Sequence, residues 1–201
     1  MQKIIFNNTI DSGKIDRAAE ILNNNGILIH PTENLYGLGA KLDAAETIKK
    51  IGEIKQRTSN KGFIILIGSK KQLEKHASSI SPQKRKLMDK YWPGALTIIF
   101  PAKKQFHDHP ACLENTFAIR LVGNSITRKI IKNCGCPIIS TSINISGNKI
   151  INDPQEIINK FSNKVEGFVI DEIHNFSTKP STIVKEKNNK IKILRQGILK
   201  L

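Results

Sequence analysis

The chain has 201 residues, enough for one large domain, and its 39% hydrophobic and 24% charged residues are typical of a globular protein rather than a disordered or fibrous one. Lysine and arginine number 32 against 17 aspartate and glutamate, which gives a formal net charge of +15. This excess favours a polyanionic partner, such as nucleic acid, a nucleotide or an anionic membrane surface.

Helices and buried strands alternate in the first third of the sequence. The apolar spacing predicts a helix over 13–26, and a buried strand follows over 26–32. A second helix is expected over 44–57, and the unbroken apolar run at 63–67 is typical of a strand covered on both faces. We interpret this succession as the beginning of a βαβ unit.

The rest of the chain continues the alternation. Helices are expected over 82–91, 124–133 and 153–161, and strands over 95–100, 117–122, 137–142, 167–171, 181–186 and 190–195. No repeat, linker or low-complexity tract interrupts this order. The sequence therefore predicts one α/β (α+β) domain over residues 1–201, with a twisted, mixed sheet flanked by helices.

The sequence gives no sign of a membrane span or of secretion. No segment approaches the roughly eighteen apolar residues that a membrane helix needs, and the chain does not open on a signal peptide. Cys112, Cys134 and Cys136 show no framework of paired spacings, so free thiols are expected. We therefore expect a cytoplasmic protein.

Polar residues gather where the predicted strands end, which is where α/β folds bind their ligands. Four clusters combine hydroxyls, small residues and cations: HPTENLYGLGA (30–40), KQRTSNKG (55–62), STSINISG (140–147) and KPSTIV (179–184). Any one of them could be an ordinary turn, because the same residues dominate turns and helix caps. Their repeated occurrence favours a site for phosphates and a carboxylate.

A phosphate site in this chain must differ from the common motifs. The pattern G-x-x-x-x-G-K-[ST] is absent, and YGLGA at 36–40 lacks the third glycine of a dinucleotide fingerprint. Lys55, Arg57 and Lys61 could instead follow a triphosphate along its length, with the arginine making bidentate contacts. A solvated basic turn is the alternative interpretation of the same residues.

A set of blocks occurs in the order and spacing of a known family: HPTENLYGLGA, KQRTSNKG with FIILI, YWPGALTIIF, FAIRL, STSINISG, KPSTIV and ILRQG. They resemble the signature blocks of the YrdC-like threonylcarbamoyl-AMP synthase family over residues 12–197. The KQR…KG block and the final RQG are most similar to the short, single-domain bacterial form.

This resemblance implies an activity, a fold and partners. The family condenses L-threonine, bicarbonate and ATP into threonylcarbamoyl-adenylate and pyrophosphate, the first step in making the modified nucleoside t6A next to certain tRNA anticodons. Its fold is a twisted mixed sheet with helices around a large, positively charged cavity. The resemblance also implies Mg²⁺ held by the ATP phosphates, and a downstream threonylcarbamoyl-transferase complex that passes the product to tRNA.

The same blocks carry the family's site residues to positions in this chain. The resemblance assigns to threonine a set with one guanidinium suited to the carboxylate: Thr32, Thr116, Arg120, Ser140 and Ser181. It assigns to ATP a second set: Lys55, Arg57, Lys61, Ser142, Asn144 and Arg195. In this set Lys55, Arg57 and Arg195 would stabilise the charge that moves onto pyrophosphate. No covalent nucleophile and no metal ligand from the protein are expected.

Two positions depart from the family pattern. Thr58 stands where a proline is usual, which should leave the cationic loop more mobile. Ile143 stands where the T-S-A-N block has alanine, which should narrow or reshape the pocket. Neither departure removes a charged contact.

Two other functions are compatible with the basic charge. One is a double-stranded RNA- or ribosome-binding module that uses the same positive concave face without synthase activity. Against it, aromatic residues make up only 5% of the chain, and no interleaved aromatic–basic motif occurs. The other is a paralogue that keeps the fold without the activity, which should have lost the K-x-R or S-x-N residues that this chain retains.

Overall fold

The computed structural model describes residues 1–7, 9–56, 62–145, 148–174 and 179–201. One ten-stranded sheet runs through the molecule, in the order β1 (Gln2–Phe6), β8 (Gly167–Asp171), β2 (Leu28–Pro31), β3 (Tyr36–Lys41), β7 (Ile138–Ser142), β4 (Ile64–Ile67), β6 (Thr116–Leu121), β5 (Leu96–Pro101), β9 (Thr182–Lys187) and β10 (Lys190–Arg195). The sheet contains parallel pairs such as β1–β8 and β4–β6 as well as antiparallel pairs such as β3–β7. The predicted α/β class with a mixed sheet is confirmed.

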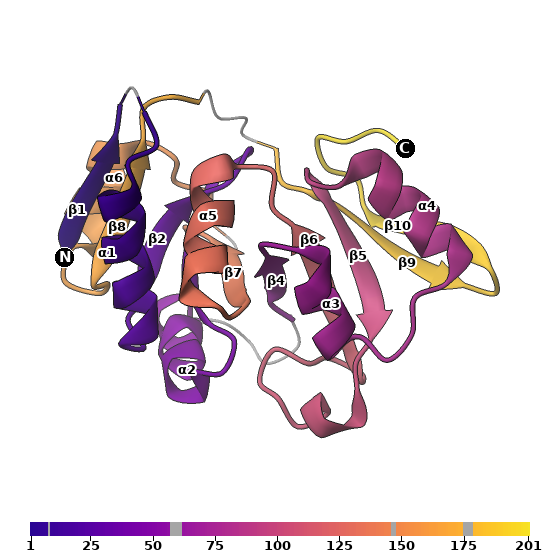
Figure 1. Cartoon of the computed structure of the whole chain (residues 1–201). Coiled ribbons are helices and arrows are strands. Elements are labelled where there is room, and N and C mark those ends of the chain that lie inside the picture. Colours follow the sequence, from indigo (N-terminus) through magenta and orange to yellow (C-terminus); the bar gives the residue numbers. More distant parts are fainter. Residues whose placement is uncertain (8, 57–61, 146–147, 175–178) are drawn as a thin grey trace.

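Within the described residues six helices flank the sheet (Figure 1): α1 (Ser12–Asn23), α2 (Ala45–Ile54), α3 (Lys70–His76), α4 (Pro82–Tyr91), α5 (Ser125–Cys134) and α6 (Pro154–Phe161). A short 3-10 helix at Lys104–Phe106 follows β5. In the described part of the chain, no helix combines the length and apolar character needed to cross a membrane. Cys112, Cys134 and Cys136 are free thiols, as predicted.

The predicted βαβ beginning is wrong in its strands. The segment after β2 turns back as β3 and pairs with it in antiparallel register, so helix α2 connects β3 to β4. These two strands are parallel, because both are antiparallel to β7, which lies between them. The sequence pattern missed β3 because Gly37 and Gly39 interrupt it, and glycine is depleted in strands.

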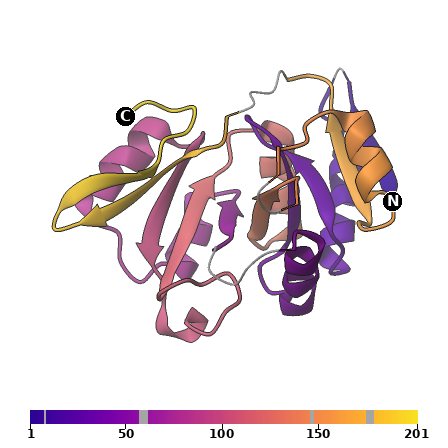
Figure 2. The same ribbon diagram turned by 180° about the vertical axis from the view of Figure 1, so that it is seen from behind.

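Two hydrophobic clusters cover opposite faces of the sheet. Ile138 and Ile139 are neighbours on β7, so their side chains point to opposite faces. Ile138 packs with α1 and α5, whereas Ile139 belongs to the larger cluster that includes residues of α2, α3, α4 and α6. Helices α1 and α5 lie side by side in front of the sheet in Figure 1, and α6 comes to the front in the reverse view of Figure 2.

Candidate substrate-binding cavity

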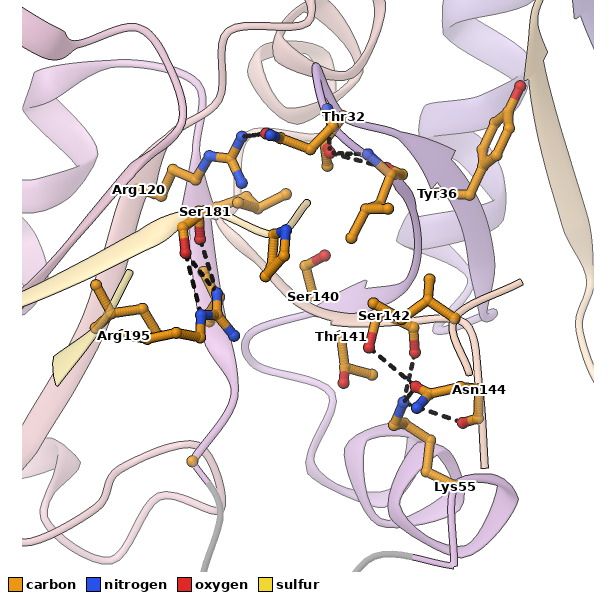
Figure 3. A pocket seen from close by; sticks show the side chains of 18 residues that line it. Thr32, Tyr36, Lys55, Arg120, Ser140, Thr141, Ser142, Asn144, Ser181 and Arg195 are labelled. Carbon is orange, nitrogen blue, oxygen red and sulfur yellow. Dashed lines mark hydrogen bonds between the residues drawn. The ribbon is translucent and has the colours of Figure 1, made fainter. Parts of the chain in front are cut away.

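A cavity of about 330 Å³ opens on the face of the sheet that α1 and α5 cover at one end. The strand register aligns its side chains, since Ser140 on β7 pairs with Gly39 on β3 and with Ile64 on β4. Ser142 lies two residues beyond Ser140 and therefore faces the same side. The side chains that line the cavity are drawn in Figure 3.

Arg120 on β6 is a buried cation of the cavity wall that already has an anionic partner. Its Nη2 lies 2.7 Å from Glu33 Oε1 and donates to Asn34 Oδ1 at 2.7 Å. Its Nε donates to the carbonyl of Gly94 at 2.9 Å. Among the described residues nothing takes the N–H groups of Nη1. Nε and Nη2 are therefore engaged by the fold, and Nη1 remains able to donate to a carboxylate.

Arg195, at the end of β10, is a second guanidinium lining the same cavity. Its Nε and Nη2 donate to the carbonyl of Ser181, and Nη2 also donates to the Ser181 hydroxyl at 3.1 Å. In the described part of the chain no carboxylate lies within 4 Å of it, and burial together with the charge of Arg120 lowers the pKa of Arg195. An anion entering the cavity would meet a positive charge that the fold has not neutralised.

Lys55 lies on the opposite side of the cavity from the two arginines (Figure 3). It follows α2, and its Nζ donates to the backbone carbonyls of Ser142 and Asn144 and to Asn144 Oδ1. The Ser142 hydroxyl donates to the same Oδ1 at 2.9 Å. The structure thus brings together Lys55, Ser142 and Asn144, three residues predicted to bind ATP, in one hydrogen-bonded group. A phosphate would have to replace one of these partners to bind the ammonium.

The hydroxyls of Thr32 and Thr116, both predicted to contact the substrate threonine, lie in very different places. Thr32 lines the cavity, where its hydroxyl donates to the Leu35 carbonyl and accepts the N–H groups of Asn34 and Leu35. Thr116 begins β6 and donates to the Leu113 carbonyl at 2.7 Å. Four residues of an extended strand span about 13 Å, so the structure does not bring Thr116 together with Arg120.

The other residues predicted to bind the substrate threonine, Ser140 and Ser181, both line the cavity. Ser181 shares a hydrogen bond of 2.9 Å with Thr97 on β5 besides its contacts with Arg195. Ser140 is hydrogen-bonded to His30 Nε2 at 3.1 Å. Sequence reasoning missed Thr97 and His30, because their partners lie 84 and 110 residues away along the chain.

Other predictions concern the loop before β4 and the end of β7. Arg57, Lys61 and Thr58 lie outside the described residues. Of the two predicted effects of Ile143, narrowing of the pocket is wrong, because Ile143 is fully buried in the larger hydrophobic cluster and is not among the described lining residues, whereas reshaping of the pocket stays a prediction. Glu33 was also missed as a site residue, although it belongs to the first polar block.

The buried imidazole of His30 leads to a prediction about stability and pH. Burial is the main cause that lowers the pKa of His30 from its ordinary 6.5 to about 4. Between these values the unfolded chain binds a proton that the folded chain does not. The free energy of unfolding should therefore fall as the pH drops from 6.5 towards 4, by an amount on the order of 3 kcal/mol.

Urea unfolding at pH 4.5 to 7.5 would test this, with His30→Phe as the comparison. The contribution of His30 should be fully present above pH 6.5, and the variant should lack it. Equal pH slopes in the two proteins would contradict the assignment.

Comparison with known proteins identifies the family to which the chain belongs. The family model Sua5_yciO_yrdC, described as "Telomere recombination", matches residues 20–197. The chain belongs to the Sua5/YciO/YrdC family. This confirms the resemblance that the seven sequence blocks indicated.

Two relatives in the Sua5/YciO/YrdC family are bacterial proteins of similar length. The threonylcarbamoyl-AMP synthase of Pseudoalteromonas translucida is 30% identical over 183 residues, which cover 90% of this chain and 97% of the relative. That of Psychromonas ingrahamii is 33% identical over 165 residues, covering 81% of this chain and 86% of the relative. Both relatives have the same name, and each matches most of this chain.

Solved structures of the family share the fold. Pyrococcus abyssi Sua5 complexed with L-threonine superimposes with a TM-score of 0.89 at 28% identity, over 98% of this chain but only 58% of that one. Escherichia coli YciO gives a TM-score of 0.85 at 23% identity, over 98% of this chain and 95% of that one. The ten-stranded fold is therefore that of the family.

Proposed function

We propose that this member of the Sua5/YciO/YrdC family is a threonylcarbamoyl-AMP synthase, which joins L-threonine, bicarbonate and ATP into threonylcarbamoyl-adenylate and pyrophosphate. Its relatives of this name at 30–34% identity support the proposal. So does the fold shared with Sua5 in complex with L-threonine. The observation that carries it is the charge of the cavity.

The cavity has more positive charge than its own residues neutralise. Arg120, Arg195 and Lys55 line it, and of the two arginines only Arg120 has a carboxylate partner, Glu33, in the described part of the chain. Every proposed substrate is an anion or carries an anionic group: the carboxylate of threonine, bicarbonate and the triphosphate. Cations held in a partly enclosed site attract such groups more strongly than they would in open water.

The proposed substrates divide the cavity between its two sides. We place the threonine carboxylate against Nη1 of Arg120, with Ser140, Ser181 and Thr32 around the amino acid. The nucleotide is proposed to extend towards Lys55, Ser142 and Asn144, with Arg195 facing the phosphates. Arg57 and Lys61 remain predicted phosphate contacts, and Thr116 remains a predicted threonine contact without support from its position.

The proposed reaction needs charge stabilisation rather than a covalent nucleophile. The threonine amine forms a bond to the carbon of bicarbonate with loss of water, which gives a carbamate. A carbamate oxygen then attacks the α-phosphorus of ATP, and the bond from that phosphorus to the oxygen of pyrophosphate breaks. Negative charge moves onto pyrophosphate in this step, where Arg195, Lys55 and Arg57 would stabilise it.

Mg²⁺ would enter this site with the nucleotide. The described residues contain no cluster of three histidine, cysteine, aspartate or glutamate side chains that could hold a metal ion. Phosphate and water oxygens are the ligands that Mg²⁺ prefers at nucleotide sites, and the ion would reduce the charge of the triphosphate there. We further propose a cytoplasmic protein whose product passes through a threonylcarbamoyl-transferase complex to tRNA.

The proposed activity can be tested with purified protein, labelled L-threonine, bicarbonate, ATP and Mg²⁺. Pyrophosphate and a labile labelled adenylate should form, and omitting threonine or bicarbonate should each abolish both products. Pyrophosphate formation that continues without threonine or without bicarbonate would contradict the proposal. If the protein formed no adenylate but bound RNA tightly, with affinity falling steeply as salt rises, an RNA-binding module would replace it.

A further inference from the structure

His30 and Ser140 form a buried pair that reaches across an intervening strand. His30 is on β2 and Ser140 is on β7, and β3 lies between these strands. Gly37 and Gly39 of β3 leave the space for the pair. A Cβ atom at Gly37 would lie 2.7 Å from Ser140 Oγ, and one at Gly39 would lie 2.8 Å from His30 Cδ2. The absence of two side chains on β3 thus permits the hydrogen bond.

The position of the imidazole proton follows from the second contact of His30. Its Nδ1 lies 3.3 Å from the carbonyl oxygen of Pro31, which can only accept a hydrogen bond. Nδ1 therefore carries the proton. His30 is completely buried, and burial together with the charge of Arg120 keeps the imidazole neutral. Nε2 is then an acceptor, so the hydroxyl proton of Ser140 must point at His30.

The direction of that proton decides what Ser140 offers to the cavity. Ser140 lines the cavity, and among the described residues His30 is the sole hydrogen-bond partner of its hydroxyl. With the proton held by His30, Oγ presents only lone pairs to a ligand. A serine hydroxyl would otherwise rotate to donate or accept as required. The pair therefore makes Ser140 a fixed acceptor in a cavity whose charged side chains, as far as the described lining residues go, are donors only.

We propose that His30 is a positioning residue that fixes Ser140 as the hydrogen-bond acceptor for the amino group of the amino-acid substrate. An α-ammonium group is a donor only, so a group that can only accept is its complement. A hydroxyl has no such requirement, because it can turn to either role. The inference rests on the proposed function and adds to it a residue that the sequence motifs left without a role.

A double-mutant cycle separates this role from a structural one. The dissociation constant of L-threonine is measured by calorimetry for wild type, His30→Phe, Ser140→Ala and the double variant. Each single substitution should weaken binding about tenfold, because the fixed acceptor is lost either way. The double variant should be no weaker than Ser140→Ala alone. Multiplying losses would overturn the proposal, since they would show that His30 acts independently of Ser140.

Two further measurements keep the proposal open to refutation. L-Valine, which keeps the amino group and lacks the hydroxyl, should lose affinity for His30→Phe by the same factor as L-threonine; a loss confined to threonine would assign Ser140 to the hydroxyl and overturn the proposal. Nitrogen chemical shifts of His30 in wild-type protein should show an unprotonated Nε2, and a protonated Nε2 would contradict the mechanism. This measurement does not require His30→Phe to fold. Failure of the wild type to bind threonine would instead refute the proposed function itself.

Discussion

Pyrophosphate formation should fall 10²–10³-fold when Arg195 is replaced by methionine, while the free energy of unfolding changes by no more than about 1 kcal/mol. The rate should fall because the proposed step moves charge onto pyrophosphate beside this guanidinium. Stability should hold because no described carboxylate pairs with Arg195, and both burial and the charge of Arg120 disfavour its cationic form. Removing the charge relieves that cost and offsets the lost hydrogen bonds to Ser181.

The matched control is Arg85→Met, which removes the same charge from an exposed position on α4. Steady-state pyrophosphate release and urea unfolding would be measured for both variants. Arg85→Met should keep full activity, so a general effect of lowering the net charge can be separated from a local one. Equal activity in Arg195→Met and the control would exclude a role for Arg195 in the reaction.

Replacing Arg120 by methionine should have a different signature, with a loss of about 2–4 kcal/mol in stability as well as the loss of threonine binding. The substitution leaves Glu33 Oε1, Asn34 Oδ1 and the carbonyl of Gly94 without their shared donor. The Glu33 side chain is 26% exposed, so water compensates part of this cost.

A second substitution can separate the two losses. In the double variant Arg120→Met/Glu33→Gln, the unpaired negative charge is removed, so part of the stability should return. Threonine binding, measured by calorimetry, should stay absent because the carboxylate still has no guanidinium. If the double variant recovers binding, Arg120 acts only by holding the fold.

The sequence predicted the elements whose residues carry a repeating pattern. Apolar runs marked β4 and β8, and helical periodicity marked α4 with the bounds that the structure has. The strand β3 was missed because the feature that shapes it, the pair of glycines beneath His30, looks like a turn when read locally. Strand order was equally hidden, since β7 enters between β3 and β4 from a distant part of the chain.

The candidate site was predictable as a list of residues but not as an arrangement. The resemblance to the family's blocks pointed to Arg120, Ser140 and Arg195, all of which line the cavity. The blocks could not show that Arg120 is paired with Glu33, because that contact joins residues far apart in sequence. Thr116 stays a prediction from the family resemblance, which could not show that an extended strand separates it from Arg120 by about 13 Å.

The position of β7 between β3 and β4 has a consequence for biosynthesis. Both neighbours are made early, yet each must wait for residues 138–142 before its free backbone edge on that side is paired. During translation the nascent chain would thus expose two open strand edges while some seventy further residues emerge, a state in which strands from different chains can pair wrongly. A topology with this many distant pairings also folds slowly. Chaperone protection of the growing chain would therefore matter most before the middle of the sheet is filled.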